Sequence, residues 1–168
     1  AVVDQLVNNN FLKNIADIYS LKNYYDELIN LERQGKKSIS NLLDSIEKSK
    51  EKPFNKVLFG LGIRYVGSNT AKILADNMEN IDNIIKADEE KLQSIYEIGP
   101  QIAQSIVRFF KEKHNLEIIE RLKSAGLNFS EKKNKKIINP NFFGKTFVLT
   151  GELTNFTREE AKSIIENL

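Results

Sequence analysis

Apolar residues recur at helical spacing through most of the chain, and the same pattern occurs three times. When the sequence is aligned on Gly35, Gly67 and Gly99, which lie 32 residues apart, four columns are apolar in all three copies. Relative to each glycine the columns stand at −4, +4, +7 and +11, and the last three fall on one face of an α-helix. They contain Leu31, Ile63, Ile95; Ile39, Ala71, Ala103; Leu42, Leu74, Ile106; and Ile46, Met78, Phe110. A period of this size is typical of repeat architectures.

Each copy predicts a short helix, a tight turn at the glycine and a second helix, which is a helix-hairpin-helix motif. Pro100 follows Gly99, and proline suits the first helical position because its missing N–H would have no intrahelical partner there. The glycine is therefore expected to be the N-cap of the second helix. We expect residues 1 to about 128 to be all-helical, with the apolar columns buried together.

The residues that follow each glycine indicate anion binding. A helix N-terminus has unpaired N–H groups and a partial positive charge, so it attracts phosphate, and glycine lets the backbone come close. The first turns carry small, polar or basic residues in place of apolar ones. The candidate DNA-binding residues are Gly35, Lys36, Lys37, Ser38, Arg64, Gly67, Ser68, Asn69, Thr70, Gly99 and Gln101. Phosphate contacts of this kind position a protein on duplex DNA without selecting a sequence.

Charge is distributed unevenly among the motifs, although the net charge is only +2. Residues 31–72 carry nine Lys or Arg against four Asp or Glu, whereas residues 73–110 carry three against seven. The first two motifs are therefore expected to bind phosphate better than the third.

Two other interpretations of the hairpins remain open. Glycine is common between two helices because the turn itself demands it, and a stacked helical repeat could bind proteins. The acidic surroundings of Gly99 favour the second interpretation for the third motif. Tyr65 and Tyr96 could stack on sugars or bases, or they could belong to the core.

The C-terminal part of the chain has a different pattern. The run EKKNKK at 131–136 is typical of a solvated linker. The stretch KTFVLT at 145–150 is β-branched and aromatic enough for a strand, and Thr157 with Glu160 forms a capping box that opens an amphipathic helix. One strand and one helix cannot close a sheet.

Three stretches, LINLERQGKKSISNLLDSIEKSK, LFGLGIRYVGSNTAKILAD and IYEIGPQIAQSIVRFF, resemble successive helix-hairpin-helix motifs of bacterial NAD-dependent DNA ligase. The first residues resemble the end of a preceding hairpin, and FFGKTFVLTGELTNFTREEAKSIIENL resembles the opening strand and helix of the BRCT domain of that ligase. The resemblance implies a mainly α C-terminal fragment. It would contain tandem hairpins over 1–128, a basic linker over 129–141 and a truncated, partly α/β BRCT segment over 142–168.

The resemblance also implies a function. The whole enzyme would seal nicks in duplex DNA in replication and repair, in the bacterial cytoplasm on the nucleoid, using NAD, Mg and Zn. Its adenylation domain, oligonucleotide-binding barrel and four-cysteine zinc module would lie upstream as partners in the same chain, and a BRCT partner stays unidentified. This fragment would bind the DNA and hold no cofactor. The family's catalytic Lys-x-Asp-Gly motif has no match, because Lys86-Ala87-Asp88-Glu89 lacks the glycine and Asp88 is expected to cap a helix.

Some positions depart from the pattern of the family. The hairpin commonly has Gly, apolar, Gly, but Arg33, Tyr65 and Glu97 replace the first glycine, and Gln34 replaces an apolar residue. The first hairpin is thus the least well specified, and Glu97 would repel a phosphate if it faced one. In phosphate-binding BRCT domains a Ser/Thr-Gly pair lies where Thr150 and Gly151 stand here. The alternative for this pair is a tight turn.

Other function classes are excluded by composition. The chain has no cysteine, which removes disulfides, cysteine zinc sites and thiol catalysis, and no apolar run approaches the roughly 20 residues of a membrane helix. His114 is the single histidine and has no partners for a metal or catalytic site. No Walker or dinucleotide fingerprint is present. The alternatives to a ligase are a tandem hairpin protein of repair or junction binding, and a helical protein-interaction scaffold.

Overall fold

The structure, a computed structural model, describes residues 2–131, 145–151 and 156–166. The described residues form helices and no strand, so the expected mainly α fold is confirmed. None of these helices is both long and apolar enough to cross a membrane. The chain divides into two compact units, Ala1–Glu131 and Lys132–Leu168.

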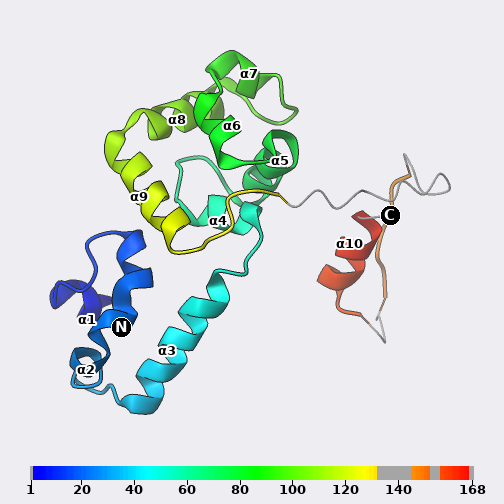
Figure 1. Cartoon of the computed structure of the whole chain (residues 1–168). Helices are drawn as coiled ribbons and strands as arrows, with labels where there is room; N and C mark the ends of the chain where they lie inside the picture. The colour runs from blue at the N-terminus through cyan, green and yellow to red at the C-terminus, as the bar shows by residue number, and fades with distance from the viewer. Residues whose placement is uncertain (1, 132–144, 152–155, 167–168) are drawn as a thin grey trace. The chain divides into compact units, whose positions relative to one another are not determined.

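The first unit contains the three predicted hairpins (Figure 1). Its elements are α1 (Val2–Asn8), the 3-10 helix η1 (Ile15–Tyr24), α2 (Tyr25–Leu28), α3 (Lys36–Ser49), α4 (Phe54–Gly60), α5 (Ser68–Met78), α6 (Ile81–Lys86), α7 (Glu89–Gln93), α8 (Pro100–Lys111) and α9 (Lys113–Ser124). The first hairpin is α2 and α3, the second is α4 and α5, and the third is α7 and α8. Pro100 opens α8 as predicted.

The apolar columns face the interior, but they do not form one core. Two separate clusters of buried residues divide the unit into a first lobe (residues 2–49) and a second lobe (residues 54–131). In the first lobe Ile39 and Ile46 pack with residues of α1, η1 and α2, and Leu31 and Leu42 remain partly exposed. The columns of the second and third hairpins pack with one another in the second lobe. The expectation that all columns are buried together is therefore wrong, because α1 and η1 cover the first hairpin in place of another hairpin.

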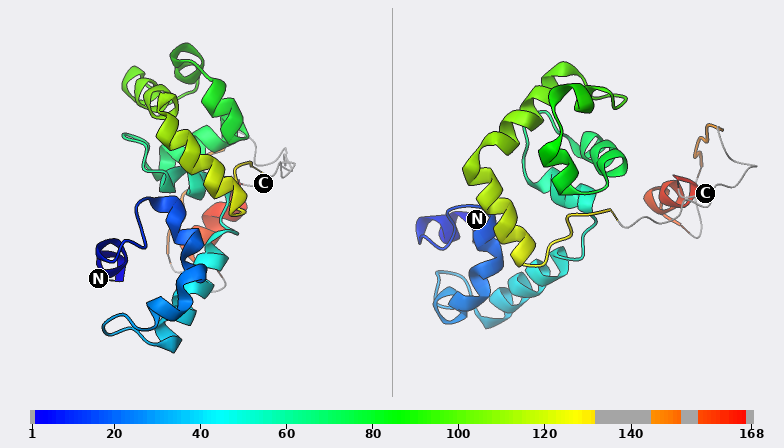
Figure 2. Two further views of the ribbon diagram at one scale, coloured as in Figure 1. Left: turned by 60° about the vertical axis from the view of Figure 1, so that its left-hand side comes forward. Right: turned by 45° about the horizontal axis from the view of Figure 1, so that its top comes forward.

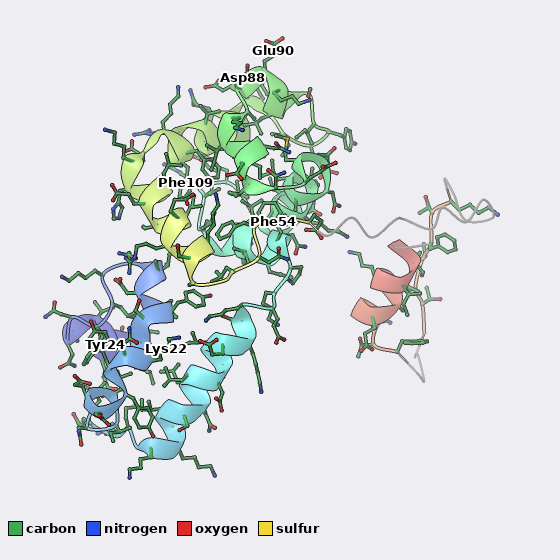
Figure 3. All side chains as sticks on the ribbon, viewed as in Figure 1. Lys22, Tyr24, Phe54, Asp88, Glu90 and Phe109 are labelled. Atoms are coloured by element: carbon green, nitrogen blue, oxygen red, sulfur yellow. The ribbon has the colours of Figure 1, made fainter. Side chains whose placement is uncertain are left out.

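The second lobe is centred on fully buried side chains of α4, α5 and α8. Phe54 at the start of α4, Leu74 of α5 and Ile106 of α8 are each 0% exposed, and Figure 3 labels Phe54 and Phe109 among the side chains of this lobe. Burial of apolar side chains on this scale contributes most of the stability of a helical unit. The two hairpins are thereby fixed against each other.

The element η1 joins the two lobes. Figure 2 shows the C-terminal end of α9 beside η1 in both views, and Ala16 of η1 belongs to the core of the second lobe. Arg121 Nη2 donates to Asp17 Oδ1 at 2.7 Å. Burial acts to raise the pKa of Asp17, but hydrogen bonds from Arg121 and from two backbone N–H groups outweigh it and hold that pKa below its usual range.

The first unit extends to Glu131. The N–H of Ile81 donates to the carbonyl of buried Phe129 at 3.0 Å, and the N–H of Glu131 donates to the carbonyl of Glu79 at 2.7 Å. The structure therefore places residues 129–131, assigned to the linker from the sequence, in the helical unit. The rest of that linker lies outside the described residues.

The second unit contains α10 (Arg158–Glu166), which begins at the predicted capping box. The N–H of Glu160 donates to Thr157 Oγ1 at 3.2 Å, and the N–H of Thr157 donates to Glu160 Oε2 at 2.7 Å. The hydroxyl of Thr157 also donates to Glu160 Oε2, at 2.9 Å, and the hydrogen bonds from the N–H and the hydroxyl of Thr157 lower the pKa of Glu160.

The predicted strand at 145–150 is absent from the described part of this unit. A strand needs a partner to pair its N–H and C=O groups, and the described residues supply none. The partial α/β segment is therefore not borne out. Gly151 has a φ of +80°, and Arg158 donates to its carbonyl at 3.2 Å, which fits the tight-turn interpretation of Thr150 and Gly151.

Candidate nucleic-acid interface

The three hairpin turns share one backbone geometry. In each turn the residue before the glycine donates its N–H to the carbonyl three residues earlier, at 3.0 Å. The carbonyl of the glycine then accepts the first intrahelical bond of the second helix, at 2.9–3.0 Å. The donors to the turn are Gln34, Val66 and Ile98, and the donors to the glycines are Ile39, Ala71 and Ala103. The sequence repeat is thus a repeat of structure.

Strain lies at the position where the family has its first glycine. Arg33, Tyr65 and Glu97 have φ values of 60°, 66° and 69°, in the left-handed region that costs a residue with a Cβ roughly 1–2 kcal/mol. Burial of Val66 and Ile98 immediately afterwards holds the second and third turns in this conformation. The departures from the family pattern therefore change the side chains on the turn and leave its backbone unchanged.

In the first hairpin hydrogen bonds replace burial. Gln34, which occupies the apolar position, donates through Nε2 to Gln5 Oε1 of α1 at 3.1 Å and accepts from Ser38 Oγ at 2.9 Å. Gln5 in turn donates to the carbonyl of Glu32 at 2.8 Å. The first turn consequently matches the other two despite its polar residue, and the hydroxyl of Ser38 is engaged within the chain.

The fold does not require glycine at the three helix caps. Gly35, Gly67 and Gly99 have φ values of −153°, −79° and −79°, which any residue adopts, and a Cβ at any of them would meet nothing within 4 Å. No side chain caps α3, α5 or α8. Glycine therefore serves neither the turn nor the packing of these residues. Its effect is to leave the helix N-termini open to a molecule from outside.

The short helices α6 and α7, which precede α8, begin differently. The side chain of Asn80 caps α6, and the side chain of Asp88 caps α7 as predicted. Each accepts a hydrogen bond from a backbone N–H in the first turn of its helix. These N-termini are closed by the chain itself.

The second hairpin presents an exposed candidate site with a positive charge beside it. Gly67, Ser68 and Asn69 are exposed, and Thr70 is half-buried. The guanidinium carbon of Arg64 lies 4.8 Å from the centroid of the Tyr65 ring. The turn thus carries a positive charge and an aromatic surface next to an open helix N-terminus.

The first hairpin lies apart from the other two. Lys36 and Lys37 are exposed in the first turn of α3, at the end of that helix farthest from the second lobe (Figure 1). The candidate residues therefore form two groups, one on each lobe.

Glu97 connects the second and third hairpins through a hydrogen bond to Asn69. This contact was not predicted from the sequence. Glu97 Oε2 accepts a hydrogen bond from Asn69 Nδ2 at 3.1 Å, so its carboxylate lies at the N-terminus of α5 and not only beside its own Gly99. The spacing of 28 residues carried no signal of this contact. In the third hairpin Gln101 is exposed, and Glu90 of α7 points away from the lobe (Figure 3).

Replacing Glu97 with glutamine should strengthen binding to duplex DNA about two- to fivefold at low salt. A charge at a helix N-terminus is worth about 0.3–1 kcal/mol, and here a negative charge would compete with phosphate for α5. The amide keeps the size of the side chain and an oxygen that can accept from Asn69. Fluorescence anisotropy with a labelled duplex at two salt concentrations would measure the change, and weaker binding by the variant would contradict it.

Metal and catalytic groups are not found at these positions. The part of the chain that the structure describes contains no group of three or more His, Asp or Glu side chains that could hold a metal ion. His114 is exposed. The arrangement can bind an anion through backbone N–H groups and basic side chains.

Comparison with known proteins agrees with this geometry. A family model described as a helix-hairpin-helix motif matches residues 56–119, which contain most of the second and third hairpins. The chain is 51% identical over 166 residues to a DNA ligase of Thermoanaerobacter pseudethanolicus, a match that covers 99% of this chain and 25% of that protein. It is 44% identical over 167 residues to a DNA ligase of Acetivibrio thermocellus, with the same two coverages.

A third relative is a DNA ligase of Koribacter versatilis, 46% identical over 167 residues, or 99% of this chain and 24% of that protein. The chain therefore spans about a quarter of the length of the curated relatives that it matches. The resemblance predicted from the three hairpins is confirmed: over nearly its whole length the chain is homologous to a segment of bacterial DNA ligases.

Proposed function

We propose that this chain binds duplex DNA through its phosphate backbone, with little sequence preference, as the DNA-gripping part of a ligase. One observation carries the proposal: glycine opens the N-termini of α3, α5 and α8 although neither the backbone conformation nor the packing requires it. The helix-hairpin-helix match and the ligase relatives support it. Phosphates would accept hydrogen bonds from the first N–H groups of these helices.

The side chains around these N-termini would contribute either positive charge or hydrogen-bond donors. Lys36 and Lys37 would add charge at the first hairpin, and Arg64 would do so at the second. The hydroxyls of Ser68 and Thr70 would donate to phosphate oxygens beside Gly67. Contacts of this kind fix the position of the protein on a duplex without reading the base sequence.

The whole enzyme is proposed to be an NAD-dependent ligase that seals nicks during replication and repair in the bacterial cytoplasm. The resemblance to the ligase family implies that NAD, Mg and Zn would be bound by its other domains, among them a four-cysteine zinc module that this cysteine-free sequence does not contain. No chemical step is assigned to the residues of this chain.

Incubation of the purified chain with NAD labelled in its adenylate group should give no covalent adduct. The Lys-x-Asp-Gly motif is missing, and Asp88 of the nearest similar stretch is occupied as a helix cap. Mass spectrometry would detect the adduct directly. A lysine of this chain that carries AMP would contradict the assignment of catalysis to other domains.

The log of the binding constant should fall against the log of salt concentration with a slope of about −4 to −5, for about four to six neutralised phosphates. Replacing Lys36 and Lys37 together with alanine should reduce the magnitude of that slope by up to about two. Both side chains are exposed, so the thermal unfolding temperature should not change.

A double alanine variant of Lys86 and Lys91 is the matched control, because both are exposed lysines of the second lobe outside the candidate site. It should change the slope less than the Lys36 and Lys37 variant does. A parent chain without measurable duplex affinity at low salt would instead favour the protein-interaction scaffold.

A further inference from the structure

A polar groove lies beside the second hairpin and extends from the first turn of α8 along the exposed face of that helix. Its volume is about 630 Å³. The turn between α4 and α5 forms one wall, the exposed face of α8 forms the other, and the start of α9 closes one end. The residues that decide its chemistry are Arg64, Tyr65, Gln101, Gln104, Arg108 and Glu112.

One hydrogen bond fixes the two walls to each other. Ser105 Oγ of α8 donates to the carbonyl of Arg64 at 2.7 Å, across a separation of 41 residues in the sequence. Arg64 from the turn and Arg108 from the helix therefore line one groove. The wall is rigid, because Ile106 on the opposite side of α8 is fully buried.

The arginine and glutamine side chains of the groove take no part in the ion pairs or hydrogen bonds of the described fold. Within residues 2–131 neither Arg64 nor Arg108 forms an ion pair, and the side chains of Gln101 and Gln104 make no hydrogen bond. Arg108, Gln101 and Gln104 are exposed. Glu112, the one carboxylate of the described lining, leaves the pair of arginines with a net positive charge.

The chemistry of these groups matches a nucleic-acid backbone. A guanidinium binds a phosphate with two parallel hydrogen bonds, and amide groups donate to phosphate and sugar oxygens. Tyr65 is 46% exposed and offers a ring against which a sugar or base can pack. A groove lined by two arginines, two glutamines and a tyrosine suits an extended strand with a repeating phosphate better than an apolar small molecule.

We propose that this groove binds one strand of DNA, with Arg108 and Arg64 holding backbone phosphates and Gln101 and Gln104 donating to phosphate or sugar oxygens. The inference rests on the proposed function and extends it. In this arrangement α8 contributes through its exposed face, whereas its own N-terminus at Gly99 lies in acidic surroundings. Arg108 becomes a DNA-binding residue that the glycine repeat does not indicate.

The test compares Arg108→Gln with Lys111→Gln in the full chain. Both residues are exposed cations near the end of α8, and Lys111 does not line the groove. Arg108→Gln should weaken duplex binding about tenfold and reduce the salt slope by about one, while Lys111→Gln should change both less. Equal effects of the two variants would overturn the inference.

Two further measurements separate this inference from the proposed function. If Arg108→Gln binds like the parent while the Lys36 and Lys37 variant is weakened, the groove is excluded and DNA binding stands; if the parent does not bind, both fail. The chain has no cysteine, so Gln104→Cys gives a single attachment point for a photo-crosslinker. Crosslinks to DNA from this position, and not from Glu90→Cys on α7, are expected, and the reverse result would contradict the groove.

Discussion

Replacing Gly67 with aspartate should weaken duplex binding about ten- to thirtyfold without lowering the free energy of unfolding. The substitution puts a carboxylate at the N-terminus of α5, where the phosphate is proposed to lie. Gly67 has an ordinary φ of −79°, and a new Cβ would meet nothing within 4 Å. Aspartate is also a favourable N-cap, so the folded state should be as stable as that of the parent.

Two controls separate charge from bulk and one hairpin from another. Gly67→Asn has nearly the same shape and is an equally good cap, but it lacks the charge, so it should weaken binding less. Gly99→Asp makes the same change in the third hairpin and should matter less than Gly67→Asp, because residues 73–110 carry three Lys or Arg against seven Asp or Glu. Binding and thermal unfolding should be measured on the same samples. If the Gly67→Asp variant is folded and binds DNA like the parent, the proposal of an anion site at Gly67 is contradicted.

Local features of this chain could be predicted because they depend on neighbouring residues. Asp88 and Thr157 mark helix starts through hydrogen bonds that span three residues, and Pro100 marks one because its missing N–H has no partner to lose there. The spacing of the apolar columns determined which face of each helix is buried. These signals are contained in short windows of sequence.

Features that depend on distant elements could not be predicted in the same way. The apolar columns predict that Ile39 and Ala71 are buried, as they are. They do not predict that α1 and η1 cover Ile39 of the first hairpin, or that Ala71 of the second hairpin shares a core with the third hairpin. The hydrogen bond between Asn69 and Glu97, like the groove at Arg108, joins residues that only the packing of α5, α8 and the turns brings together. The predicted strand at 145–150 failed for a related reason, since β-propensity becomes a strand only where a partner is present.

Sequence and structure each explain part of why glycine stands at positions 35, 67 and 99. The regular spacing of these glycines indicated a repeated turn, and two explanations, the demand of the turn and access for an anion, remained open. The structure places the strained φ values two residues earlier, at Arg33, Tyr65 and Glu97. The turn therefore demands its unusual conformation at residues that are not glycine, and access for an anion is the explanation that the proposed function gives for the three glycines.

Replacing Leu74 with alanine should destabilise the chain by about 3 kcal/mol, whereas Leu42→Ala should cost about 1 kcal/mol. The two leucines occupy the same column of the repeat, but Leu74 is 0% exposed in the core of the second lobe and Leu42 lies at the partly exposed edge of the first. Removing a fully enclosed side chain leaves a cavity that rigid neighbours cannot fill. Ile106→Ala, in the same column of the third hairpin, should resemble Leu74→Ala.

Urea unfolding followed by far-UV circular dichroism would measure these differences, and equal losses for Leu42 and Leu74 would contradict the division into two cores. The same variants also distinguish stability from binding. Leu74→Ala should bind DNA like the parent at temperatures where it is folded, and it should lose binding only as it unfolds. Gly67→Asp should show the opposite behaviour, with full stability and weak binding at every temperature. A Leu74→Ala variant that is folded but binds weakly would mean that the open N-terminus of α5 depends on the packing of its helix as well as on Gly67.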